Sequence, residues 1–242
     1  MKLLIVQSEQ EFYAAAAEAV LNQLQRNPEL VLGIATGNTT VGLHRELALQ
    51  SKARSLSWEK VRTFNLDEYL GLSPENPRSC SWRTFDQLVI PTGMKPENAH
   101  IPCPDPDRAE ETLSAYPERI RQAGGIDLQI LGLGTNGHIG MNEPGTPWGQ
   151  DMLTVSLSEQ TLSDKRDFWG GLDNVPRGGI TMGIRLVMQG RRQLLCARGA
   201  DKAQAIRDAL CGPVTEQVPA SALQLHPELT VLLDEAAASL LR

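Results

Sequence analysis

Short apolar runs alternate with segments of helical spacing, and this alternation restricts the possible fold more than any other feature of the chain. The apolar runs cover residues 3–6, 30–35, 61–66, 126–133, 192–197 and 229–233. Helical patterns lie between them, at residues 10–26, 41–51, 108–123 and 201–210. Several runs are apolar on both faces, as in strands that are covered on both sides. The pattern predicts an α/β fold with a doubly wound, mostly parallel, Rossmann-like sheet and helices on both faces.

The amino-acid composition indicates a globular protein that acts on a small molecule. Among 242 residues, hydrophobic types make up 41% and charged types 21%, which is typical of a globular protein. No repeat or low-complexity tract divides the chain, so we expect a single domain over residues 1–242. The net charge of −6 argues against binding to nucleic acid or to an anionic membrane and favours a small-molecule partner. The apolar run near the N-terminus has four residues, too few for a signal segment, so we predict a cytoplasmic protein.

The cysteines give no support for a metal site. Cys80, Cys103, Cys196 and Cys211 lie far apart and form no C-x-x-C pair. Zinc sites and disulfide frameworks use closer and more regular spacings. We therefore expect no metal and interpret these thiols as buried or idle.

The loop after the second apolar run reads ATGNTTVGLHREL. In open parallel sheets, ligands bind beyond the carboxyl ends of the strands, so this loop is a candidate binding site. Gly37 and Gly42 have the spacing of a phosphate loop, but Leu43 and His44 replace the Lys and Ser or Thr that a nucleoside triphosphatase needs. The small residues that open the following helix still present backbone N–H groups suited to a phosphate. They are Thr36, Gly37, Asn38, Thr39 and Thr40. An ordinary helix cap by a Thr or Asn side chain is the alternative.

Two adjacent acids, Asp67 and Glu68, follow the third apolar run in the stretch FNLDEYLGL. Neighbouring side chains on an extended chain point in opposite directions, so at most one of the two faces a pocket. Leu66 and Tyr69 flank the pair and could desolvate a carboxylate, which favours a functional role over a solvated turn.

The stretch GTNGHIGMNEPG, residues 134–145, follows the fourth apolar run. Together with Gly132 it satisfies the G-x-G-x-x-G dinucleotide fingerprint, but Pro144 and Pro147 break the long helix that this fingerprint should open. A nicotinamide-dependent dehydrogenase is therefore disfavoured. His138 and Glu143 make better sense as a catalytic pair, in which the carboxylate accepts one imidazole N–H and leaves the other nitrogen free to transfer protons.

At this point the motifs resemble a known family. VLGIATGNTTVGLHREL, FNLDEYLGL, GLGTNGHIGMNEPG, GADKAQAI and PASALQLHPELTVLLDEAA occur in the order and spacing of glucosamine-6-phosphate deaminases, which share a fold with 6-phosphogluconolactonases. The resemblance covers nearly the whole chain. The lactonase branch usually has a different acid–Arg motif after the third strand and lacks the NEPG turn. The deaminase branch is therefore the better match.

The resemblance implies conversion of a hexosamine 6-phosphate and water to fructose 6-phosphate and ammonia, with no metal or organic cofactor. His138, oriented by Glu143 and Asn136, would open the sugar ring, and Asp67 would move a proton from C2 to C1. Residues 36–40 would hold the substrate, with Lys202 on its phosphate. A galactosamine-6-phosphate deaminase giving tagatose 6-phosphate, a 6-phosphogluconolactonase and a non-catalytic sugar-phosphate sensor are the alternatives.

Several positions depart from the family pattern. Asn136 stands where longer members have an aspartate, so we expect His138 to be less basic than it would be beside an aspartate. Arg166 lies near, but not at, the register of a phosphate-binding arginine in a lid segment, and Asp167 follows it. Ser79-Cys80 replaces the usual Ser-Tyr, which leaves the epimer open. The chain ends at Arg242 without the C-terminal extension of the allosteric hexamers, so we predict neither their hexamer nor their activation, although a homo-oligomer stays open.

Overall fold

The computed structural model describes residues 1–241, apart from the side chain of Asn38. Its centre is a seven-stranded sheet in the order β1-β10-β9-β6-β2-β3-β5, and all neighbouring strands in it are parallel. The strands are β1 (Lys2–Val6), β2 (Val31–Ile34), β3 (Arg62–Asn65), β5 (Ala99–His100), β6 (Leu128–Leu131), β9 (Gln193–Ala197) and β10 (Leu229–Asp234). Each predicted apolar run coincides with one of these strands, which confirms the parallel sheet.

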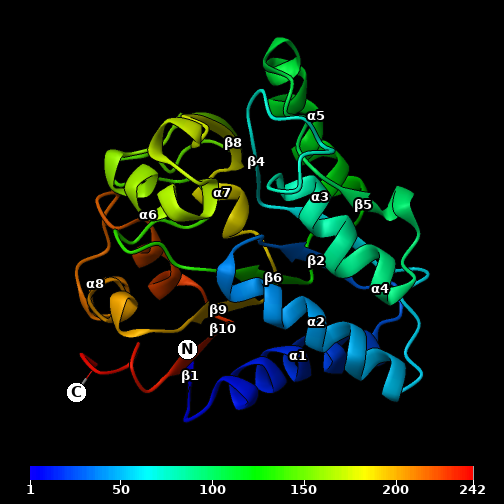
Figure 1. Cartoon of the computed structure of the whole chain (residues 1–242). Coiled ribbons are helices and arrows are strands. Elements are labelled where there is room, and N and C mark those ends of the chain that lie inside the picture. The colour runs from blue at the N-terminus through cyan, green and yellow to red at the C-terminus, as the bar shows by residue number, and fades with distance from the viewer. Residues whose placement is uncertain (242) are drawn as a thin grey trace.

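Helices cover both faces of this sheet (Figure 1). One face carries α1 (Glu9–Arg26), α2 (Asn38–Ala53) and a continuous helical segment made of α3 (Cys80–Thr84), the π-helical η1 (Phe85–Val89) and α4 (Ile90–Thr92). The other face carries α5 (Ala109–Gln122), α7 (Ile184–Val187) and α8 (Ala203–Cys211). Short 3₁₀ turns are η2 (Pro96–Asn98), η3 (Pro106–Arg108), η4 (Leu172–Asn174), η5 (Ala200–Lys202) and η6 (Pro219–Leu225). The doubly wound arrangement is therefore confirmed.

The two hydrophobic cores explain why the strands are apolar on both faces. Leu32 and Ile34 of β2 pack in the core under α1 and α2, whereas Val31, the residue before Leu32, packs in the core under α5 and α8. Successive side chains of a strand point to opposite faces, so a strand between two helical layers has no polar side.

A small antiparallel sheet, which the sequence pattern did not predict, lies beside the main one. Its strands run in the order β4 (Asp67–Tyr69), β8 (Gly178–Met182) and β7 (Met152–Ser156). The chain passes from β3 into β4 through Leu66, whose backbone is hydrogen-bonded to both sheets. Its N–H donates to the Ile34 carbonyl of β2 at 2.9 Å, and its carbonyl accepts the Met182 N–H of β8 at 2.7 Å. Strands this short, and a β8 that starts with two glycines, give little periodic signal.

Helix α6 (Glu159–Trp169) was also not predicted, although its ends carry recognisable signals. Ser158 is its N-cap, with the side-chain oxygen accepting the Thr161 N–H, and Gly170 ends it in the left-handed conformation. The run of polar residues between these caps hides the helical period. The helical segment of residues 80–92 was not predicted either, because its π-helical middle part departs from the 3.6-residue period.

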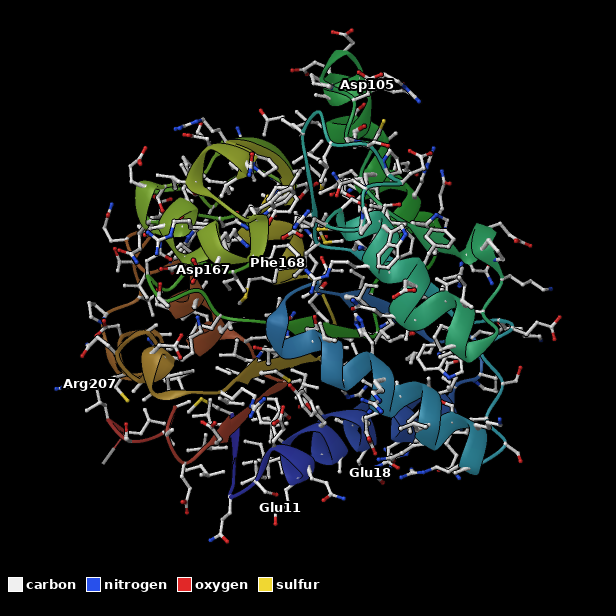
Figure 2. All side chains as sticks on the ribbon, in the orientation of Figure 1. Glu11, Glu18, Asp105, Asp167, Phe168 and Arg207 are labelled. Atoms are coloured by element: carbon white, nitrogen blue, oxygen red, sulfur yellow. The ribbon has the colours of Figure 1, made fainter. Side chains whose placement is uncertain are left out.

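Polar and charged side chains project from the periphery, where Figure 2 labels Glu11, Glu18 and Arg207. All four cysteines are free thiols; Cys80 and Cys196 are buried and Cys211 is exposed. Within residues 1–241, no helix combines the length and the apolar character needed to cross a membrane. The single-domain boundary at 1–242 stays a prediction, and Arg242 lies outside the described residues.

Candidate active site

A cavity of about 440 Å³ opens at the carboxyl ends of β2, β6 and β9. The loops after these strands supply much of its wall, as expected for an open parallel sheet. The small sheet adds Asp67 and Tyr69, while α3 adds Cys80 and Arg83. Helix α6 closes one side with a set of residues spaced three to four apart, which are Thr161, Asp164, Lys165 and Phe168.

The loop after β2 contributes Thr36, Gly37, Thr39 and Thr40 to the cavity wall. Gly37 is the N-cap of α2, so the alternative of a cap by a Thr or Asn side chain is wrong. The Thr40 hydroxyl instead accepts the Gly37 N–H at 2.8 Å and donates to the Gly37 carbonyl at 3.1 Å. The backbone of Asn38 begins the helix, and its side chain lies outside the described residues. The positive end of the α2 dipole therefore meets the cavity.

Several cations line the cavity. Lys202 follows β9, as predicted, and is joined by Arg198, Arg83 and Lys165. Arg83 donates to the Gly37 carbonyl at 3.0 Å, which brings it beside the start of α2. Burial lowers the pKa of the Lys165 ammonium, but its interactions with the Tyr69 hydroxyl and with Asp67 raise it by more, so the pKa lies above its ordinary value. The wall thus combines a helix N-terminus with fixed positive charge, which suits a phosphate.

Helix α6 contributes Lys165, and not Arg166, to the cavity wall, in agreement with the position of Arg166 outside the family register. Arg166 is exposed, pairs with Asp167 at 3.4 Å and is not among the cavity-lining residues, whereas Lys165 is. Figure 2 labels Asp167 and Phe168 at the end of α6, and Phe168 lines the cavity. Thr161, Lys165 and Phe168 are three to four residues apart and therefore lie on one face of α6, which meets the cavity. This face could not be recognised from the sequence because the helix itself was not predicted.

Of the two adjacent acids, only one faces the cavity, as expected. Asp67 lines the cavity and is 8% exposed, and burial raises the pKa of its carboxyl to about 6, although the Lys165 charge opposes this. Glu68 points away and accepts backbone N–H groups from Tyr69, Cys80 and Ser81 at 2.8, 3.0 and 2.8 Å. A carboxylate that titrates near neutral pH inside a cavity is suited to take and return a proton.

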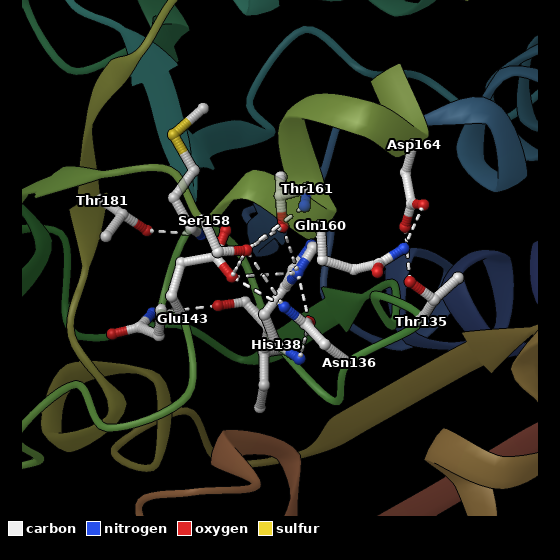
Figure 3. A network of polar contacts seen from close by, with 12 residues as sticks. Thr135, Asn136, His138, Glu143, Ser158, Gln160, Thr161, Asp164 and Thr181 are labelled. Carbon is white, nitrogen blue, oxygen red and sulfur yellow. Dashed lines mark hydrogen bonds and ion pairs between the residues drawn. The ribbon is translucent and has the colours of Figure 1, made fainter. Parts of the chain in front are cut away.

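His138 also lines the cavity, but its link to Glu143 differs from the expected one. Its Nδ1 lies 2.8 Å from Asn136 Oδ1 and 3.8 Å from Glu143 Oε2. The Asn136 amide nitrogen donates to Glu143 Oε2 at 2.8 Å (Figure 3). The direct imidazole–carboxylate hydrogen bond is therefore wrong, because the Asn136 amide stands between the two groups. Asn136 and Glu143 lie behind His138 rather than among the residues that line the cavity.

The amide orientation fixes the histidine tautomer. With the Asn136 NH₂ directed at a carboxylate, its Oδ1 faces Nδ1 and accepts a proton there, which leaves Nε2 unprotonated. Burial lowers the pKa of His138 to about 4, and the charge of Glu143 opposes this. Although burial acts against it, the pKa of Glu143 is lowered by a hydrogen bond with Thr161 and by His138, Asn136 and Ser158. The low basicity of His138 thus comes first from burial.

Glycine is required where the loop meets the imidazole. A Cβ on Gly134 would lie 2.2 Å from His138 Nδ1 and Cε1. Gly140 takes a left-handed φ of 59°, and a Cβ there would lie 2.9 Å from Thr181 Oγ1 and 3.3 Å from Asp67 Oδ2. No helix follows β6 within residues 132–151, in agreement with the exclusion of a dinucleotide fold. The glycines serve the packing of His138 and Asp67.

Sequence reasoning missed some polar residues of the site. Cys80, interpreted as buried or idle, has its Sγ 3.5 Å from Asp67 Oδ1. Ser158 and Thr161 contact Glu143 and His138 from the first turn of α6. The N-cap and the helical spacing of residues 158, 161 and 165 were the available signals, and they became useful only once α6 was known.

Comparison with known proteins agrees with this geometry. Residues 7–232 match the family model described as glucosamine-6-phosphate isomerases/6-phosphogluconolactonase. The glucosamine-6-phosphate deaminase of Thermoanaerobacter pseudethanolicus is 42% identical over 241 residues, covering 100% of this chain and 95% of the relative. Glucosamine-6-phosphate deaminase 2 of Bacillus subtilis is 43% identical over 244 residues, covering 100% of this chain and 98% of the relative.

Solved structures give the same result. A monomeric glucosamine-6-phosphate deaminase superposes with a TM-score of 0.96 at 38% identity, covering 99% of this chain and 100% of that one. The 6-phosphogluconolactonase of Leishmania guyanensis superposes with a TM-score of 0.78 at 19% identity, covering 98% and 97%. The second similarity shows the shared fold alone.

Proposed function

Because the chain belongs to the glucosamine-6-phosphate isomerase/6-phosphogluconolactonase family, we propose that it converts a hexosamine 6-phosphate and water to a ketose 6-phosphate and ammonia. Glucosamine 6-phosphate, giving fructose 6-phosphate, is the substrate we favour, since the relatives at 37–43% identity carry the name glucosamine-6-phosphate deaminase. The observation that carries the proposal is one cavity that holds a buried carboxyl, a neutral imidazole and a positively charged wall.

His138 opens the ring in this scheme. Its unprotonated Nε2 takes the proton from the O1 hydroxyl of the pyranose, the C1–O5 bond breaks, and a proton is returned to O5. Nδ1 stays bonded to Asn136, which Glu143 holds in place. A neutral imidazole is needed for the first of these transfers, and the lowered pKa of His138 supplies it at neutral pH.

Asp67 then moves the carbon-bound proton. Its carboxylate takes the proton from C2 of the open-chain aldehyde while O1 gains a proton from the substrate ammonium, which gives an enolamine. Asp67 then returns its proton to C1, which gives a protonated ketimine. Water adds to C2, and the C2–N bond breaks to release ammonia and the ketose. With a pKa of about 6, Asp67 is ionised at neutral pH and still basic enough to accept a proton.

The phosphate lies, in this proposal, at the N-terminus of α2 with Lys202 beside it. The residues that would hold the substrate there are Thr36, Gly37, Asn38, Thr39, Thr40 and Lys202. Backbone N–H groups and an ammonium recognise a phosphate dianion without any further group. A cytoplasmic location and the oligomeric state stay predictions; the solved relative described as monomeric is the available guide to the latter.

The test is to measure ammonia and ketose phosphate release from glucosamine 6-phosphate and from galactosamine 6-phosphate side by side. Release of fructose 6-phosphate supports the proposal, and release of tagatose 6-phosphate alone would select the galactosamine epimer. Asp67→Asn and His138→Ala should abolish turnover. Hydrolysis of 6-phosphogluconolactone without ammonia release would instead identify a lactonase, and binding without either reaction would identify a sensor.

A further inference from the structure

Ser158 joins the catalytic loop to helix α6. Its hydroxyl donates to Glu143 Oε2 at 2.9 Å, and its oxygen accepts the Thr161 N–H at 3.2 Å as the N-cap of α6. One hydroxyl therefore serves both the helix end and the carboxylate behind His138. Figure 3 shows Ser158 between the two, with Asn136 on the same carboxylate oxygen.

The carboxylate depends on this contact for its orientation. Both donors, the Ser158 hydroxyl and the Asn136 amide, meet Glu143 at Oε2. The other oxygen, Oε1, is buried and has no hydrogen-bond partner among the described residues. Loss of the Ser158 hydroxyl would leave Glu143 with the Asn136 amide and Thr161 as its side-chain partners, which would loosen the orientation of the carboxylate.

The orientation of Glu143 matters because it helps to fix the orientation of the Asn136 side-chain amide. The amide presents Oδ1 to His138 Nδ1 while its nitrogen points at Glu143, and the same Oδ1 accepts the His138 backbone N–H at 3.1 Å. A turned amide would present NH₂ to Nδ1, which would move the imidazole proton to Nε2 and remove the base from the cavity. Thr161, in the same turn of α6, adds a second contact, with Oγ1 3.3 Å from His138 Nδ1.

We propose that Ser158 is a positioning residue for this reaction, which holds Glu143, and through it Asn136 and His138, in the geometry that leaves Nε2 free. The inference rests on the proposed function, but its chemical content is the tautomer of His138, which can be measured without turnover.

The experiment separates hydroxyl donation from helix capping. Ser158→Gly removes the donor but costs an N-cap only a few tenths of a kcal/mol, whereas Ser158→Ala costs about 1 kcal/mol. Ser158→Thr keeps both functions. Ser8→Ala is the matched control, because Ser8 caps α1 in the same way, accepting Glu11 N–H at 3.2 Å, and is absent from the cavity wall.

We expect Ser158→Gly and Ser158→Ala to lower kcat by about 10-fold to 100-fold with KM little changed, since a misplaced catalytic group costs rate rather than binding. Ser158→Thr should recover most of kcat, and Ser8→Ala should match the parent. Full kcat in Ser158→Gly would overturn the proposal, because capping alone would then explain the contact. The proposal would also be overturned if Ser158→Ala destabilised α6 and raised KM by as much as it lowered kcat, because loss of the cap would then explain the effect.

The second measurement uses the ¹⁵N chemical shifts of the four histidines, with His138→Gln to assign the signal. The parent should show His138 protonated at Nδ1, and Ser158→Gly should show it partly or wholly protonated at Nε2. An unchanged tautomer in Ser158→Gly would contradict the proposal even if the parent released no ammonia. Absence of ammonia release from the parent would, by contrast, remove the proposed function and leave the tautomer result standing.

Discussion

Replacement of Gly134 by alanine tests whether the position of His138 carries the activity. The added Cβ would lie 2.2 Å from Nδ1 and Cε1, and ordinary contact begins near 3.4 Å, so the imidazole must retreat by about 1.2 Å. Gly134 does not have a left-handed φ, so alanine adds no backbone strain. The change therefore acts on the imidazole rather than on the loop.

That displacement is large enough to break the contact that fixes the tautomer. Nδ1 now lies 2.8 Å from Asn136 Oδ1, and a retreat of about 1.2 Å directly away from this oxygen would take the pair to about 4.0 Å, beyond hydrogen-bond range. A misplacement of about 1 Å in a catalytic group can cost about 100-fold in rate. We expect kcat to fall by this factor, equivalent to about 2.7 kcal/mol, with a smaller effect on KM.

The assay is steady-state ammonia release from glucosamine 6-phosphate by Gly134→Ala, His138→Ala and Gly149→Ala. Gly149 is the control, because a Cβ there meets no atom within 4 Å. Gly134→Ala should lie between the parent and His138→Ala, and Gly149→Ala should match the parent. If Gly134→Ala kept half or more of the parental kcat, either the imidazole can be displaced without loss or its position does not limit the rate.

Three further predictions concern charge. Lys165→Met should raise the pKa of Asp67 further, because the Lys165 charge now opposes the rise, and should move the acid limb of the kcat/KM profile to higher pH, while Arg166→Met at the exposed neighbour should leave it in place. In the parent, kcat/KM should fall as pH drops through about 6, where Asp67 becomes protonated, and a profile flat down to pH 5 would exclude Asp67 as the base. Burial lowers the pKa of His44 from 6.5 to about 4, so its contribution to folding is complete above pH 6.5 and is lost as pH falls toward 4; chemical denaturation across this window should show up to about 3 kcal/mol of pH-dependent stability that His44→Leu reduces.

The main sheet could be predicted from the sequence because its strands have no polar face. Leu32 and Val31 enter opposite cores, so β2 is a continuous apolar run that periodicity detects. The small sheet could not be predicted, since β4 has three residues and pairs with β8, more than a hundred residues later in the chain. Pairing at such separation leaves no local pattern.

The same distinction applies to the site. Thr36, Asp67 and His138 lie in the segments that follow β2, β3 and β6, where the topology of an open sheet places ligands, and they line one cavity. Lys165 and Ser158 belong to α6, whose polar sequence hides its helix. The prediction of a direct His138–Glu143 hydrogen bond was wrong. A spacing of five residues does not show that a third side chain, Asn136, bonds to both groups and links them.

The two carboxyl groups behind the chemistry are shifted in opposite directions, and this separates their roles. Asp67 is buried with few hydrogen-bond donors, the Cys80 thiol at 3.5 Å among them, so its pKa rises toward neutrality and it can exchange a proton. Hydrogen bonding with Thr161, the charge of His138 and the donors on Asn136 and Ser158 together lower the pKa of Glu143 against burial, so it stays ionised. An anion that never takes the proton can hold the Asn136 amide throughout the reaction, whereas a carboxyl that titrates near pH 6 would release it in each cycle. We therefore propose proton transfer by Asp67 and His138, with Glu143 orienting His138 through Asn136.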